Sequence, residues 1–162
     1  MAQEDQSLRN NYLKTLTDKS FEKMREKDEE NREKFKKIFK ERGYISSKYG
    51  KDVQLAAFLI VQHMPKEEHL FMKKYLSLMK EDLENINTLN YAQLVDRVRI
   101  YEGKKQLYGT QFELVEGREG VYKVKEIYDF KRVNERREKI GLGKLEEYVE
   151  ELVKERDIKI TL

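Results

Sequence analysis

The 162-residue sequence contains no cysteine and a single proline, and it has no long hydrophobic run. Without cysteine the chain has no disulfide, no thiolate nucleophile and no cysteine-ligated zinc. The longest apolar run, Leu55 to Val61, is far shorter than the roughly 20 residues that a membrane-spanning helix needs. The acidic stretch Met1–Asp5 lacks the apolar segment of a secretory signal. We therefore expect a soluble cytoplasmic protein that does not engage a membrane.

Charge is abundant but nearly balanced. Charged residues make up 40% of the sequence, with 34 basic against 31 acidic side chains and a net charge of +3. Nucleic-acid-binding proteins usually concentrate basic residues on one face, whereas lysine and glutamate are interspersed here, as on solvated helix surfaces. Binding to nucleic acid is therefore disfavoured. The length suits one domain with a buried core, so we expect a single domain over 1–162, with 1–27 as a peripheral N-terminal helix.

Hydrophobic spacing predicts a mainly α fold, a compact helical domain with one inserted β-hairpin at about residues 106–126. The helices are expected at about residues 8–42 (as one helix or two), 51–64, 65–85, 91–101, 130–140 and 145–156. The segment 51–64 is apolar nearly all round, which is typical of a central helix. In the hairpin, two alternating segments flank the turn Glu116–Gly120.

His63 lies at the end of the most apolar predicted helix. A histidine there is either a core side chain with a satisfied hydrogen bond or a general base at the floor of a cleft. A metal site with His69 would need a third ligand, and the spacing of the two histidines matches no common metal motif, so we predict no metal.

Asp96 and Arg97 are neighbours on a predicted helix, about 100° apart, so they do not face each other. Asp96 lies on a semi-buried face, where a carboxylate needs a cationic or N–H partner. One interpretation is a structural ion pair with Arg136 or Arg137. The alternative is functional, with Asp96 orienting His63 and Arg97 binding an anionic ligand.

The segment Gly103–Gln111 mixes glycine with polar side chains in a strand-like stretch. If it is extended, Gln106, Tyr108 and Thr110 point one way, and the intervening residues point the other way. Gly109 within a strand indicates a bulge or a close approach by another group. Glutamine both donates and accepts hydrogen bonds, so Gln106 and Gln111 suit recognition of a polar ligand, although solvated glutamines on an edge hairpin would need no ligand.

Three blocks resemble those of an uncharacterised bacterial domain-of-unknown-function family: Ala56–His63 with its Gln-His pair, Tyr91–Val98 with Asp-Arg-Val, and Gly103–Gln111 with Gln-Leu-Tyr-Gly-Thr-Gln. Weaker similarity at Asp28–Asn31, Gly43, Val133–Arg137 and Gly141–Leu142 extends the resemblance from about residue 28 to residue 148. The resemblance implies a shared architecture and shared polar positions, but no activity. Many members of that family carry Trp-Pro where this chain has Tyr44-Ile45, and Asp where it has Asn134.

The leading functional hypothesis is a domain that binds a small polar or phosphorylated ligand at the helix/hairpin junction and is hydrolase-like. In it, His63 and Asp96 are the catalytic pair, and the ligand is bound by Arg97, Gln106, Tyr108, Gln111 and Arg137. The sequence has no nucleophile-elbow, phosphate-loop, zinc-helix or dinucleotide motif, so it predicts no cofactor and does not decide whether the protein is an enzyme.

Two alternatives stay open. The first is a non-enzymatic protein-interaction module in a regulatory or bacterial defence or toxin-immunity system. The second and weaker one is RNA binding through hairpin lysines and the arginines at 132, 136 and 137. The sequence leaves the oligomeric state open.

Overall fold

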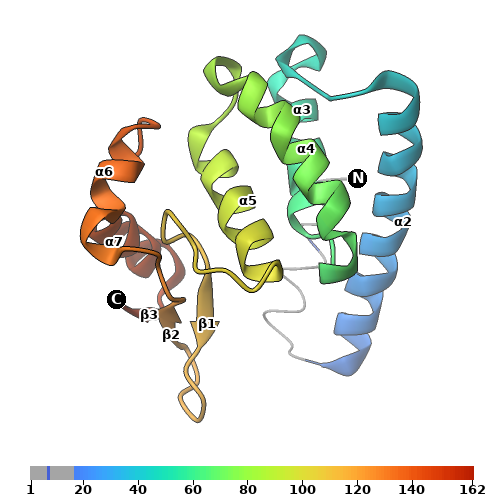
Figure 1. Ribbon diagram of the computed structural model, residues 1–162. Coiled ribbons are helices and arrows are strands. Elements are labelled where there is room, and N and C mark those ends of the chain that lie inside the picture. The colour runs from blue at the N-terminus through green and yellow to red at the C-terminus, as the bar shows by residue number, and fades with distance from the viewer. Residues whose placement is uncertain (1–6, 8–16) are drawn as a thin grey trace. The chain divides into compact units, whose positions relative to one another are not determined.

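The computed structural model describes residue 7 and residues 17–162, and its contacts divide the chain into two units, Met1–Asn85 and Ile86–Leu162 (Figure 1). Each unit is described by itself. The fold is mainly α, as predicted. The expectation of a single domain stays a prediction, and most of the N-terminal helix expected over 1–27 lies outside the described residues.

The helical elements of the first unit are α2 (Asp18–Arg42), η1 (Ser47–Tyr49), α3 (Lys51–Gln62), η2 (Lys66–Glu68), α4 (His69–Glu81) and η3 (Leu83–Asn85). The Thr17 side chain accepts a hydrogen bond from the Ser20 N–H and caps the start of α2. Gly43, with φ of 72°, ends α2 as predicted, since glycine adopts this left-handed conformation without strain. The helix predicted over 65–85 is divided, because α4 ends at Glu81 and a short η3 follows.

Aromatic side chains form much of the core of the first unit. Phe35 and Phe39 on α2 meet Phe71 and Tyr75 on α4 with ring centroids 5.1–6.2 Å apart, and Tyr44 lies 5.2 Å from Tyr75. Edge-on and tilted arrangements at this spacing stabilise a core beyond the area that the rings bury.

The prediction that α3 is buried all round was wrong. Ala57, Phe58 and Val61 are buried, whereas Val53 and Leu55 are exposed. The helix packs against α2 and α4, so only one of its faces is covered. An apolar composition alone therefore overstated its burial.

The second unit contains α5 (Thr88–Tyr101), β1 (Phe112–Leu114), β2 (Val121–Val124), η4 (Phe130–Arg132), α6 (Val133–Glu138), α7 (Leu145–Arg156) and β3 (Lys159–Thr161). Asn87 caps α5 by accepting from the N–H groups of Leu89 and Asn90. The predicted hairpin is confirmed: β1 and β2 pair antiparallel, with Phe112 opposite Val124.

A third strand was missed by sequence analysis. β3 pairs parallel to β2, with Ile160 opposite Tyr122. Asp157 ends α7 in a left-handed conformation, with φ of 51°, and the chain continues into β3. The core of this unit gathers Val133, Leu145 and Val149, with the sheet residues Phe112, Val124 and Ile160 packed against them.

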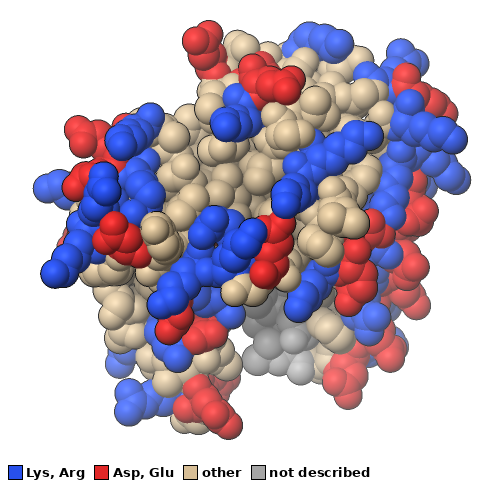
Figure 2. Space-filling view, in the orientation of Figure 1, with Lys and Arg blue, Asp and Glu red and all other residues tan. Residues whose placement is uncertain are grey.

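Among the residues that the structure describes, no helix combines the length and the apolar character needed to cross a membrane. Basic and acidic side chains are interspersed over the face shown in Figure 2.

Candidate functional site

The carboxylate of Asp96 on α5 binds the backbone of one loop. It is fully buried and accepts hydrogen bonds from the N–H groups of Leu107 (2.7 Å), Tyr108 (3.1 Å) and Thr110 (3.0 Å), and from the Thr110 hydroxyl (2.9 Å). Hydrogen bonds to an ionised acceptor contribute roughly 1.5–3 kcal/mol each, more than those between neutral groups. Asp96 therefore organises the loop 107–110.

Asp96 needs no guanidinium partner within this unit. Burial raises the pKa of Asp96, and the three N–H donors and the Thr110 hydroxyl oppose that rise by stabilising the ionised form. Within the described part of the chain, neither Arg136 nor Arg137 forms an ion pair with it, so the ion pair considered from the sequence was wrong. The prediction that this carboxylate needs a cationic or N–H partner is met by N–H groups.

The buried side-chain amide of Gln106 forms hydrogen bonds with backbone groups, as a peptide group in a sheet does. Its Nε2 donates to the carbonyls of Gln111 (3.0 Å) and Lys125 (2.7 Å), and its Oε1 accepts from the Gln111 N–H (2.9 Å). Its backbone bonds to Glu126 and Tyr128. The Gln106 side chain therefore pairs with peptide groups of its own chain, at Gln111 and Lys125.

Arg137 on α6 is 2% exposed, and its guanidinium binds carbonyl groups. Its Nε donates to the Gly143 carbonyl and its Nη1 to the Tyr108 carbonyl, both at 2.7 Å, while the Tyr148 ring lies 5.0 Å from the guanidinium carbon. Burial lowers the pKa of Arg137, and the neighbouring Tyr148 and Asp96 oppose that shift. The side chain is fixed between the loop 107–110 and the segment before α7.

Arg136 connects two loops. Its Nε donates to the Leu107 carbonyl (3.0 Å), and its terminal nitrogens donate to the carbonyls of Tyr128 (2.5 Å) and Asp129 (3.1 Å and 3.2 Å). Asp129 has φ of 41°, a left-handed conformation that non-glycine residues adopt at a cost of about 1–2 kcal/mol. The guanidinium holds this strained segment in place.

Gly109 is required by its surroundings. Its φ is +77°, and a Cβ there would lie 2.6 Å from Cδ1 of Leu145 and 3.1 Å from Cδ1 of Ile127. The close approach predicted at this glycine is therefore confirmed, and the approaching groups are core side chains of the same unit. The segment is not extended: residues 107–109 form a bend, and the N–H groups of Leu107, Tyr108 and Thr110 turn toward one carboxylate, so the alternation that an extended backbone would give does not apply.

Arg97 and Gln111 contact each other beside this loop. The Arg97 Nε donates to Gln111 Oε1 at 3.3 Å, and Gln111 Nε2 donates to the Gln93 carbonyl at 3.2 Å. The Tyr108 ring is half-buried, and burial raises the pKa of its hydroxyl. These side chains complete a network that we call the loop clamp, defined as Asp96, Arg97, Gln106, Tyr108, Thr110, Gln111, Arg136 and Arg137.

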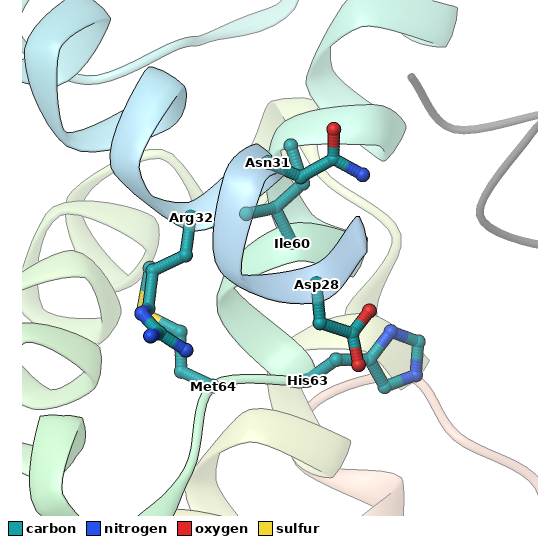
Figure 3. Close-up of a pocket in the computed structure, with 6 residues that line it drawn as sticks. All are labelled: Asp28, Asn31, Arg32, Ile60, His63 and Met64. Carbon is teal, nitrogen blue, oxygen red and sulfur yellow. The ribbon is translucent and has the colours of Figure 1, made fainter. Parts of the chain in front are cut away.

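His63 belongs to the first unit, where it lines a small cavity with residues of α2. The cavity is bordered by Asp28, Asn31, Arg32, Ile60, His63 and Met64 (Figure 3). In this view the Asp28 carboxylate points toward the imidazole of His63, and Arg32 extends toward Met64. The cavity holds about 10 Å³, room for about one water molecule, and it is partly open to solvent.

The predicted site residues are thus distributed over both units. The second unit brings together Asp96, Arg97, Gln106, Tyr108, Gln111 and Arg137, and His63 is placed at the cavity of the first unit. No group of three or more metal-ligating side chains occurs among the described residues.

Sequence analysis missed residues that matter in both places. It considered Arg136 only as an ion-pair or RNA-binding residue, although Arg136 joins two loops. It assigned no role to Asn31, which is buried in the first unit. The only sequence signal for Asn31 was its four-residue spacing from Phe35 and its eight-residue spacing from Phe39, which places it on the apolar face of α2.

The family of unknown function DUF6624 matches residues 1–161. This chain belongs to that family. The match agrees with the resemblance to an uncharacterised domain family that the sequence blocks carry. No curated protein and no solved structure matches the chain.

Proposed function

We propose that this member of DUF6624 is a non-enzymatic protein-interaction module, whose contact surface is the segment Tyr128–Phe130. The observation that carries the proposal is that polar side chains of the loop clamp form hydrogen bonds within the protein. Asp96, Gln106, Arg136 and Arg137 of this clamp bind the chain's own backbone, and Arg136 fixes a segment that exposes two aromatic rings.

The first support is chemical. Asp96 already accepts from three N–H groups and a hydroxyl, which are the contacts that a general base would offer to a substrate. Gln106 and Arg137 bind backbone carbonyls in the same way. A ligand at the helix/hairpin junction would have to displace these internal hydrogen bonds, so we rank the small-ligand hypothesis for this region second.

The second support is the exposure of the two rings. Tyr128 is 57% exposed and Phe130 is 49% exposed, and they flank Asp129, which has a positive φ. Single exposed apolar residues are ordinary. Two aromatic rings on a segment held by one guanidinium resemble the rigid anchors that dominate protein interfaces, since ordering them costs little entropy on binding.

The partner that fits this segment is a folded protein with an apolar recess for the two rings. Lys131 follows directly and is exposed, so an acidic group beside the recess would complement it. RNA fits less well, because several hairpin lysines already face carboxylates. Lys123 and Lys125 lie 2.9 Å and 3.0 Å from Glu113, and Lys105 lies 3.3 Å from Glu126.

The test compares variants of the purified full chain. The immobilised parent, Tyr128→Ser/Phe130→Ser and Leu114→Ser proteins are incubated with extract of the cells that naturally express the chain. Leu114 is the matched control, since it is 56% exposed in the same unit. A protein retained by the parent and by the control is then purified and titrated against all three.

The proposal predicts that the double variant binds this purified partner at least about 30-fold more weakly, the loss expected for a hot spot of about 2 kcal/mol. The control should bind like the parent. Arg136→Gln should weaken binding by a smaller factor, because both rings remain but their segment is no longer fixed. Equal binding by the parent and the double variant would overturn the proposal.

A further inference from the structure

Three hydrogen-bond donors beside the loop 107–110 have no internal partner and reach the surface. Arg99 on α5 donates through its Nε to the Lys105 carbonyl (2.8 Å), but its two terminal nitrogens bind nothing among the described residues. The Tyr108 hydroxyl likewise forms no hydrogen bond within the described part of the chain, although the Tyr108 N–H binds Asp96. Both side chains are partly exposed and none of these donor atoms is buried, so all three are open to solvent.

The Arg136 guanidinium lies close to the same donors. Its Nε donates to the Leu107 carbonyl, two residues from the carbonyl that holds Arg99, and two residues of backbone span at most about 7 Å. Burial raises the pKa of Tyr108, and the positive charges of Arg136 and Arg99 oppose that rise, so both guanidinium groups act on this hydroxyl. The three side chains therefore form one cluster, which we call the arginine cluster (Arg99, Tyr108 and Arg136).

The arginine cluster carries positive charge without an ion pair. Neither Arg99 nor Arg136 forms a salt bridge among the residues that the structure describes, whereas the neighbouring Lys104 and Lys105 each lie within 3.3 Å of a glutamate carboxylate. The carboxylate of Asp96 also acts on Tyr108, but it is buried and already accepts from internal donors. An anion at the cluster therefore meets two positive charges that no exposed carboxylate offsets.

From these observations we infer that the arginine cluster binds the phosphate group of a phosphate monoester. Because the Nε of Arg99 is already bound, the open edge of its guanidinium presents both terminal nitrogens, which can donate in parallel to two phosphate oxygens. The Tyr108 hydroxyl donates to the third oxygen. Arg136 contributes charge, since each of its nitrogens already donates to a carbonyl. A monoester carries nearly two negative charges at neutral pH and three acceptor oxygens, whereas a carboxylate carries one charge and two oxygens.

Phosphate binding at this position leaves the loop clamp intact. The three donors that bind the phosphate are unused within the described part of the chain, so no internal hydrogen bond has to break. The ligand site expected from the sequence would instead take Arg97, Gln106 and Gln111 from their internal hydrogen bonds. The phosphate site goes beyond the interaction surface proposed above and does not depend on it.

The phosphate can come from a free small ester or from a phosphorylated serine of another protein. Methyl phosphate is the probe for the first source, and N-acetyl-O-phosphoserine methylamide is the probe for the second. Dimethyl phosphate keeps one charge and two free oxygens, and acetate is the carboxylate control. All four are titrated at millimolar concentration and constant ionic strength into the ¹⁵N-labelled full chain, at about pH 7.5, where a monoester is mostly dianionic.

NMR follows the side-chain Nε–H signal of Arg99 and the backbone N–H signals of Lys105 and Tyr108. The inference predicts a saturable shift with a monoester, and an affinity at least about 10-fold lower for dimethyl phosphate and acetate, because each accepts fewer charge-assisted hydrogen bonds. A response to the phosphoserine probe identifies a phosphorylated protein as an accepted source. A response to methyl phosphate alone identifies free esters.

Four variants separate the arginine cluster from charge in general. Arg99→Gln should lose the monoester response at the backbone signals, and Tyr108→Phe should weaken binding about 10-fold, the value of one hydrogen bond to a charged group. Arg99→Lys keeps the charge but cannot donate from two nitrogens, so it should bind more weakly than the parent. Arg118→Gln is the matched control, because it removes the same charge from an exposed residue of the same unit, and it should respond like the parent.

No saturable response of the parent to either monoester, or an equal affinity for dimethyl phosphate, would overturn the inference. An unchanged response in Arg99→Gln would also overturn it, because the probe would then bind elsewhere. Tyr108→Phe removes a single oxygen and keeps the backbone contacts of the loop, so it tests the site even if Arg99→Gln rearranges the loop. An affinity of Tyr108→Phe equal to that of the parent would overturn the assignment of the third donor.

Discussion

The buried amide of Asn31 in the first unit contrasts with the buried polar groups of the loop clamp in the second unit. In the second unit, Asp96, Gln106 and Arg137 are buried, and each binds backbone groups of its own unit. In the first unit, Asn31 is equally buried, and neither atom of its amide is paired within the described part of the chain. A paired buried group stabilises and fixes the fold, whereas an unpaired one destabilises it. The comparison therefore separates buried polar residues that stabilise the fold from one that lowers its stability.

The largest expected effect is the loss of the Asp96 carboxylate. Asp96→Ala removes the acceptor of three N–H groups and one hydroxyl and leaves these donors unpaired in the interior. We therefore expect the free energy of unfolding to fall by roughly 3–5 kcal/mol. Asp96→Asn keeps one acceptor oxygen and should cost less. Urea unfolding of the three proteins measures both changes. A loss below about 1 kcal/mol for the alanine variant would mean that the loop 107–110 is held by other contacts.

A second effect in the same loop comes from Gly109. Gly109→Ala introduces a Cβ 2.6 Å from a Leu145 methyl group and places alanine at φ of +77°, so we expect a loss of roughly 2–4 kcal/mol from overpacking and backbone strain. Gly103→Ala is the matched control. It has a similar φ of +73° but open space around the added atom, so only the backbone cost of about 1 kcal/mol remains. Equal losses for both variants would show that Leu145 moves aside freely.

The comparison predicts the opposite sign in the first unit. Asn31→Leu replaces an unpaired amide with an apolar group of similar size, and it should raise the free energy of unfolding by roughly 1–2 kcal/mol. The thermal midpoint would rise by about 2–4 °C for each kcal/mol in a chain of this length. Gln106→Leu is the contrasting variant and should destabilise, because its amide is fully paired. If Asn31→Leu destabilises as well, Asn31 has partners and the distinction between the units fails.

A smaller effect concerns the tyrosine hydroxyl of Tyr44. Burial, together with the negative charge of Asp82, raises the pKa of Tyr44 to about 12 from its usual 10.0. The folded state therefore holds this proton more tightly than the unfolded state. The resulting stability is fully present below pH 10 and is lost as the pH rises through about 12. Ultraviolet titration of tyrosinate in the parent and in Tyr44→Phe measures the midpoint, and a value near 10 would contradict the expected shift.

Much of the architecture follows from local signals in the sequence. Helix spacing, the glycine after Arg42 and the turn at 116–120 predicted the elements that the structure contains. Sequence analysis did not predict β3, because this strand is only three residues long, although the alternation of Ile158, Ile160 and Leu162 was a usable signal. The one-sided burial of α3 was not predicted, because the hydrophobic composition of a helix does not show which of its faces is packed against other elements.

The candidate site was harder to predict than the fold. The sequence located the polar residues 96–111 and the close approach at Gly109, since polar groups in an apolar pattern require partners. It did not reveal that the partners are backbone N–H and carbonyl groups, because every residue type supplies these. For the same reason the sequence could not predict the role of Arg136, whose guanidinium donates to backbone carbonyls.

The central claim is that the Asp96 carboxylate is used to hold a loop, and amide hydrogen exchange tests it most directly. Leu107, Tyr108 and Thr110 lie outside helices and strands, so their N–H groups are protected chiefly by that carboxylate. We predict that in the parent all three exchange nearly as slowly as the core amides of α5, and that in Asp96→Asn they exchange much faster while the α5 amides change less. Rapid exchange of these three amides in the parent would contradict the account.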